Sequence, residues 1–110
     1  MRMYDIIKKK RDGGALSKEE IDFFIKGYVD GSTPDYQASA FCMAVFYSGM
    51  TEEETASLTL SMAHSGDTVD LSRFGTLSAD KHSTDGAGDK TTLIVAPIGA
   101  CLGCVTAKMR

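Results

Sequence analysis

Two helix-start motifs constrain the first half of the chain more than any other feature. Each is a capping box, with a hydroxyl residue followed three positions later by glutamate: Ser17 with Glu20, and Thr51 with Glu54. The hydroxyl accepts a hydrogen bond from the backbone N–H three residues on, and the glutamate accepts one from the N–H of the capping residue. Helices are therefore expected to begin just after Ser17 and just after Thr51.

The spacing of apolar residues predicts four short helices over roughly the first 65 residues. The second helix carries Ile21, Phe24, Ile25 and Tyr28 at i, i+3, i+4 and i+7. We expect Thr33 to cap the third helix, with Pro34 at its first helical position and Gly49 at its end. The other apolar residues of these helices are expected in one helix–helix core: Met3, Ile6, Ile7, Tyr36, Ala40, Phe41, Ala44, Tyr47, Leu58 and Met62.

One basic run, Lys8-Lys9-Lys10-Arg11, comes directly before Asp12-Gly13-Gly14. We interpret it as the carboxyl end of the first helix, where cations interact favourably with the helix dipole and glycine ends the helix. The whole chain has a net charge of −3, which gives no electrostatic footprint for nucleic acid. No nucleic-acid partner is expected.

The composition is that of a soluble globular protein, with 110 residues, 43% hydrophobic and 25% charged. Met1-Arg2-Met3 leads into charge rather than into a signal peptide, and no apolar run approaches the ~20 residues of a membrane span. Three cysteines, an odd number, favour a reducing compartment. We therefore expect a cytoplasmic protein without a membrane partner, and we interpret Cys101 and Cys104 as small buried hydrophobic residues rather than a redox or zinc site.

The character of the sequence changes after Ser65-Gly66-Asp67. We expect an α+β arrangement: a four-helix α domain over residues 1–65, a connector over 66–76, and the start of an α/β domain over 77–110. In that last part a strand at 77–82, a loop at 83–90, a helix at 91–102 and a strand at 104–108 form one β-α-β unit. Pro97 conflicts with the helix, so a strand at 93–96 is the alternative. One such unit leaves sheet edges open, which favours a part of a larger two-domain protein.

The segment Asp80–Thr92 has the residues of an anion-binding loop. It holds glycines, Lys81 and several hydroxyls, including Ser83 and Thr92, and an apolar run follows. Backbone N–H groups, a helix start and a lysine together attract an anion. The segment matches neither G-x-x-x-x-G-K-[ST] nor G-x-G-x-x-G, so its composition alone fits a phosphate loop and an ordinary polar loop equally well.

This segment, with Ala107-Lys108-Met109, resembles the phosphate-binding region of the pyrimidine-nucleoside phosphorylases, which include thymidine phosphorylase. The resemblance continues to the amino terminus and covers essentially the whole chain. The segments that carry it there are Met1-Arg2-Met3, Lys9-Lys10-Arg11-Asp12-Gly13, Leu16-Ser17-Lys18-Glu19-Glu20-Ile21, Gly27-Tyr28, Pro34-Asp35-Tyr36-Gln37 and Gly49-Met50-Thr51-Glu52-Glu53-Glu54-Thr55.

The resemblance implies a pentosyltransferase that splits a pyrimidine nucleoside with inorganic phosphate into the free base and a (deoxy)ribose 1-phosphate. It implies a homodimer formed through the helical domain, a potassium ion and no organic cofactor. The implied phosphate site comprises Lys81, His82, Ser83, Thr92, Lys108, Met109 and Arg110, with His82 also a catalytic candidate. Gly88 and Lys90 fall where the family binds potassium, largely through backbone carbonyls.

Three residues depart from the family's pattern. Asp85 stands where glycine is usual, Ala87 where valine is usual, and Arg110 where the motif continues with serine. The family's base-contacting residues lie further on, so these residues alone are expected to be inactive. Two other readings stay open: an enzyme like anthranilate phosphoribosyltransferase, which shares the fold, and a non-catalytic helical association module.

Overall fold

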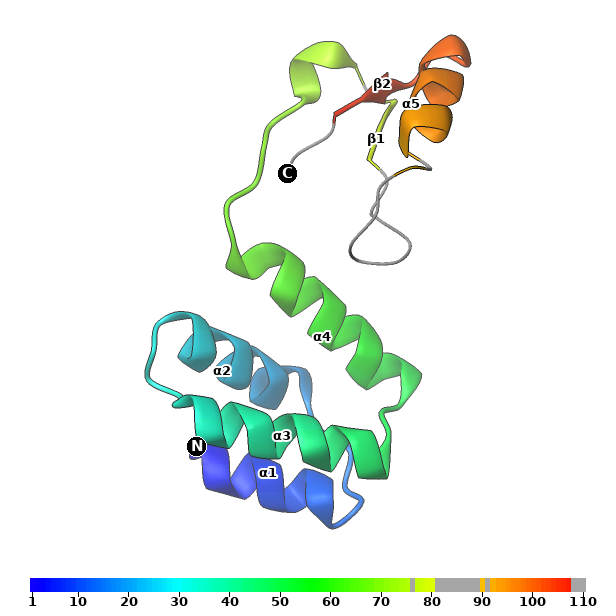
Figure 1. Ribbon diagram of the computed structural model, residues 1–110. Coiled ribbons are helices and arrows are strands. Elements are labelled where there is room, and N and C mark those ends of the chain that lie inside the picture. Colours follow the sequence, from blue (N-terminus) through cyan, green and yellow to red (C-terminus); the bar gives the residue numbers. More distant parts are fainter. Residues whose placement is uncertain (76, 81–89, 91, 108–110) are drawn as a thin grey trace. The chain divides into compact units, whose positions relative to one another are not determined.

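The computed structural model describes residues 1–75, 77–80, 90 and 92–107. The chain divides into two compact units, Met1–Thr68 and Val69–Arg110. Each unit is described by itself below, with its elements labelled as in Figure 1. Among the described residues, no helix combines the length and the apolar character needed to cross a membrane.

The first unit contains the four predicted helices: α1 (Met3–Arg11), α2 (Lys18–Val29), α3 (Asp35–Ser48) and α4 (Glu52–Ser65). Both predicted capping boxes are confirmed. The Ser17 hydroxyl accepts the Glu20 N–H at 3.3 Å, and the Thr51 hydroxyl accepts the Glu54 N–H at 3.1 Å. The glutamates accept the N–H groups of their capping residues at 2.7 and 2.8 Å.

The predicted start of α3 is wrong by one residue. Pro34, not Thr33, occupies the capping position, with extended backbone at φ −71° and ψ 156° and no side-chain cap. Proline disfavours a helical conformation in the residue before it, so Thr33 is held outside the helix. Thr33 is instead buried against α2, where its N–H donates to the carbonyl of Gly27 at 2.8 Å.

The core of the first unit lies where α2 packs on α4 and α1 packs on α3. Phe24 of α2 and Phe41 of α3 stack at its centre, with ring centroids 4.0 Å apart. The buried residues of this core are Met3, Ile6, Leu16, Ile21, Phe24, Ile25, Ala38 and Phe41. Leu58 of α4 is partly buried against this cluster.

Several residues predicted for the core lie on the surface. Tyr36 and Tyr47 of α3 are 73% and 79% exposed, and Ala40 and Met62 are exposed as well. The reason is that α3 is apolar around most of its circumference, whereas neighbouring helices cover only the side that carries Phe41. The exposed aromatic side therefore has no cover within the described part of this unit.

One lysine of the basic run at the end of α1 forms a buried ion pair in addition to any interaction with the helix dipole. Lys10 points inward and is 3% exposed, and its ammonium group lies 2.9 and 3.0 Å from the two carboxylate oxygens of Glu54 on α4. This buried ion pair links α1 to α4. Because an unpaired buried charge is costly, the loss of either partner is expected to destabilise the unit. The predicted stop after α1 is confirmed by Gly13, which has φ +85°.

The second unit contains a short 3₁₀ turn η1 (Ser72–Phe74), strand β1 (Ser78–Ala79), helix α5 (Thr92–Cys101) and strand β2 (Val105–Thr106). The strands pair in parallel, with Ser78 opposite Val105 and Ala79 opposite Thr106. The strand–helix–strand order agrees with the predicted unit, but each strand has two residues, fewer than predicted. Of the predicted strand residues, 81, 82 and 108 lie outside the described part.

Helix α5 continues through Pro97, so the alternative of a strand at 93–96 is wrong. It ends in a Schellman motif, in which the Gly103 N–H donates to the Ala100 carbonyl and the Cys104 N–H to the Gly99 carbonyl. Gly103 has the expected positive φ, +92°. The burial predicted for the cysteines is wrong for Cys101, which is exposed, while Cys104 is half-buried. The reason is that the last turn of α5 is open to solvent there.

Candidate functional site

The second unit brings three chain segments to one edge of its small sheet. The Ala107 N–H donates to the Ala79 carbonyl at 3.3 Å, so the residues that follow the two strands, Asp80 and Ala107, are neighbours. Thr92 begins the helix that joins the strands and, with Asp80 and Ala107, lines one cavity. In open α/β sheets, ligands bind outside the carboxyl ends of parallel strands, and this edge is that position.

Two cavities open beside Asp80 and Ala107. One, of about 120 Å³, lies between the strands and α5 and is lined by Ala79, Asp80, Thr92, Val95, Ala96, Gly99, Cys104, Thr106 and Ala107. The other, of about 270 Å³, is lined by Val69, Leu71, Ser78, Ala79, Asp80 and Ala107. Both are smaller than the roughly 300–1,000 Å³ of most organic-ligand sites.

Helix α5 presents its amino-terminal end at this edge. Thr92, its first residue, is half-buried, and the first turn carries no acidic residue. The dipole of this ten-residue helix favours an anion at its amino-terminal end. Lys90, two positions earlier, is exposed and lies in a turn. Of the residues predicted for the phosphate and potassium sites, Thr92 and Lys90 are therefore the two that the structure describes.

The other predicted site residues lie outside the described part of the chain. They are Lys81, His82, Ser83, Gly88, Lys108, Met109 and Arg110. Their roles stay predictions. In the sequence, Lys81 directly follows Asp80 and Lys108 directly follows Ala107.

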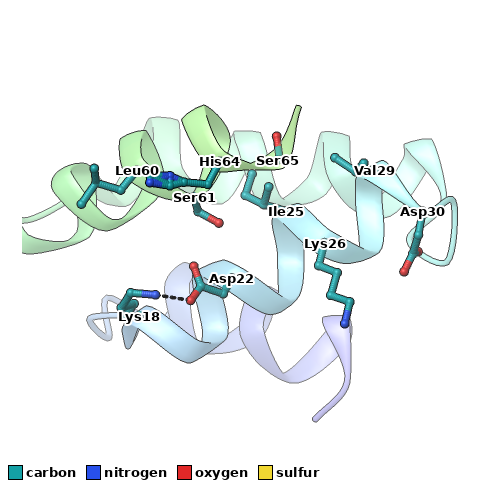
Figure 2. Close-up of a pocket in the computed structure, with 10 residues that line it drawn as sticks. All are labelled: Lys18, Asp22, Ile25, Lys26, Val29, Asp30, Leu60, Ser61, His64 and Ser65. Carbon is teal, nitrogen blue, oxygen red and sulfur yellow. Dashed lines mark hydrogen bonds and ion pairs between the residues drawn. The ribbon is translucent and has the colours of Figure 1, made fainter. Parts of the chain in front are cut away.

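A groove between α2 and α4 is a second concave region, which the sequence analysis did not predict (Figure 2). Its volume is about 570 Å³, and Ile25, Val29 and Leu60 supply its apolar surface. The polar residues of the groove are Lys18, Asp22, Lys26, Asp30, Ser61, His64 and Ser65. The i, i+4 spacing from Lys18 to Asp30 along α2 was a sequence signal for a charged helix face, but not for a groove.

Asp22 is the most strongly engaged polar residue of this groove. Its carboxylate accepts a hydrogen bond from Lys18, as Figure 2 shows. Hydrogen bonds from Lys18 and Ser61 hold the pKa of Asp22 below its ordinary value, and the positive charge of Lys18 acts in the same direction. Within the described ranges, no three histidine, cysteine, aspartate or glutamate residues lie close enough together to hold a metal ion. The groove therefore offers an apolar surface with a charged rim, in which Lys18 and Asp22 form an ion pair.

Comparison with known proteins decides the family. Residues 4–66, which comprise nearly all of α1 to α4, match the helical bundle domain of a glycosyl transferase family. The chain belongs to this family. The match covers more than half of the residues and coincides with the four-helix unit.

The resemblance to pyrimidine-nucleoside phosphorylases is confirmed by similar sequences over 99% of the chain. The chain is 61% identical over 109 residues to the pyrimidine-nucleoside phosphorylase of Geobacillus stearothermophilus. It is 59% identical to that of Staphylococcus haemolyticus and 55% identical to that of Bacillus subtilis, again over 109 residues. The chain spans 25% of the length of each of these relatives and corresponds to their amino-terminal quarter.

Proposed function

We propose that this chain contributes part of the phosphate site of a pyrimidine-nucleoside phosphorylase. The observation that carries the proposal is the 61% identity to a protein of that name over 109 residues, which include the whole segment Asp80–Thr92. The amino-terminal end of α5 beside Asp80 and Ala107 supports it, because this is where a βα unit binds small anions.

In the proposed reaction, phosphate attacks the anomeric carbon of a pyrimidine nucleoside and the base departs. The bond between sugar and base breaks with oxocarbenium character on the sugar. Phosphate itself is the nucleophile, so the protein has to hold phosphate in line and stabilise charge. Lys81 supplies a full positive charge, and Ser83 and Thr92 supply hydroxyl donors.

The remaining proposed site residues complete the phosphate contacts. His82 lies next to Lys81 in the sequence and is the proposed catalytic residue, on the side of the departing base. Lys108, Met109 and Arg110 are proposed to reach the phosphate from the segment after β2. Arg110 replaces the serine of the family's pattern and adds a charged, bidentate donor there.

A potassium ion is proposed to brace the segment before α5, through the backbone carbonyls of Gly88 and Lys90. The ammonium group of Lys90 has no acceptor, so this residue can offer the ion its main-chain oxygen alone. Lys90 is exposed in a turn, which leaves that side chain free to point away from the ion. When bound, the ion supplies fixed positive charge near the phosphate.

The exposed side of α3 supports a second proposal, that the helical unit associates with a second copy of itself. Phe46 and Tyr47 are 77% and 79% exposed, and their rings contact each other edge to face with the ring centroids 5.4 Å apart. Together with Tyr36 and Met43 they form an apolar surface, which we call the α3 aromatic face. Large exposed aromatic surfaces mark association sites in soluble proteins.

A chimera tests the proposed function. Residues 1–110 replace the corresponding quarter of the Geobacillus stearothermophilus relative, and release of uracil or thymine is measured with excess phosphate. We expect turnover by the chimera and none by the 110-residue chain alone, because orientation of phosphate against a fixed sugar contributes several kcal/mol. A chimera that folds like the relative but releases no base would contradict the proposed function. Turnover by the isolated 110-residue chain would contradict the proposal that it holds only part of the phosphate site.

A further inference from the structure

We draw no further inference here: the strongest candidate, the groove between α2 and α4 that Ile25, Val29 and Leu60 line (Figure 2), is an unpartnered apolar face, and nothing in the structure shows what covers it.

Discussion

The ammonium group of Lys10 lies 2.9 and 3.0 Å from the two carboxylate oxygens of Glu54, although 44 positions separate the two residues. The same carboxylate accepts the Leu16 N–H at 2.7 Å and the Thr51 N–H at 2.8 Å. One side chain thus connects the end of α1, the segment before α2 and the start of α4. Glu54 is 1% exposed, so this network depends on complete pairing.

Replacing Lys10 by methionine should strongly destabilise the helical unit. The substitution leaves the Glu54 carboxylate buried without its cation, and breaking a buried ion pair costs about 3–5 kcal/mol. The free energy of unfolding in urea measures the loss. Lys9→Met is the matched control, because Lys9 pairs with Glu20 at the surface, where such pairs contribute about 0–1 kcal/mol. Equal losses in both variants would contradict the structural role of Lys10.

The stability of the helical unit should fall in acid through Glu54. Burial alone would raise the pKa of Glu54, but the N–H groups of Leu16 and Thr51 and the ammonium of Lys10 outweigh burial and lower it. A carboxyl whose pKa is lowered by folding stabilises the protein above its unfolded pKa, about 4.3, and loses this contribution as the pH falls through the folded value.

We therefore expect the unfolding free energy to decrease between pH 5 and pH 3, and to decrease less in Glu54→Gln. Denaturation curves at a series of pH values measure both slopes. The comparison with Glu54→Gln is necessary because surface carboxylates such as Asp5 and Asp22 also have lowered pKa values. If the unfolding free energy falls equally steeply with pH in both proteins, Glu54 is not a source of the acid sensitivity.

Alanine at Gly27 should destabilise the contact between α2 and the segment before α3. A Cβ atom there would lie 2.5 Å from Thr33 Oγ1 and 3.2 Å from Ser32 Oγ. Overpacking of this kind costs about 1–3 kcal/mol, and over most of this range the cost exceeds the gain of about 1 kcal/mol that alanine has over glycine in a helix. Thermal melting should show a lowered Tm for Gly27→Ala.

Gly66→Ala is the control for that variant, because its Cβ would meet nothing within 4 Å and its φ is −111°. The double variant Gly27→Ala with Thr33→Ala removes the Thr33 hydroxyl that the new Cβ atom would contact. Its loss of stability should therefore be smaller than the sum of the losses of the two single variants. Additive losses would show that the close approach of Gly27 and Thr33 is not the cause.

Glutamate at Phe46 should abolish the proposed association through the α3 aromatic face. Phe46 is 77% exposed, so the change should leave the folding of the unit intact while placing charge in the contact. Sedimentation velocity at several concentrations should show dimer for the wild-type chain and monomer for Phe46→Glu. Leu102→Glu is the control, an equally exposed residue of the other unit. A wild-type chain that sediments as a monomer throughout would reject this surface as a self-association site.

Lys81→Ala in the chimera should weaken the use of phosphate. A charge-assisted hydrogen bond contributes about 1.5–3 kcal/mol, so kcat/KM for phosphate should fall at least about tenfold. Steady-state kinetics at fixed nucleoside measure it. Lys26→Ala is the control, because Lys26 lies in the α2–α4 groove, and it should leave kcat/KM for phosphate unchanged. A change within about twofold for Lys81→Ala would mean that Lys81 does not contact phosphate.

The helix of the second unit followed from local sequence signals. The polar segment before an apolar run predicted a helix at 91–102, and α5 spans Thr92–Cys101. Pro97 made that prediction ambiguous, because proline removes one hydrogen bond from a helix interior. The phosphate contacts proposed for Lys81 and His82 rest on the family resemblance rather than on such local signals, since a phosphate site needs groups from separate chain segments.

The starts of α2 and α4 were determined by the sequence itself, because a capping box joins residues three positions apart and needs no other part of the chain. Tertiary structure decided whether the glutamate of each capping box is exposed or buried. Glu20 remains near the surface beside Lys9, while Glu54 is buried with Lys10. Likewise, spacing alone predicted apolar stripes on α3, but only packing decided that Phe41 is buried and Tyr47 exposed. Periodicity is local, whereas burial depends on which distant segments arrive to cover a face.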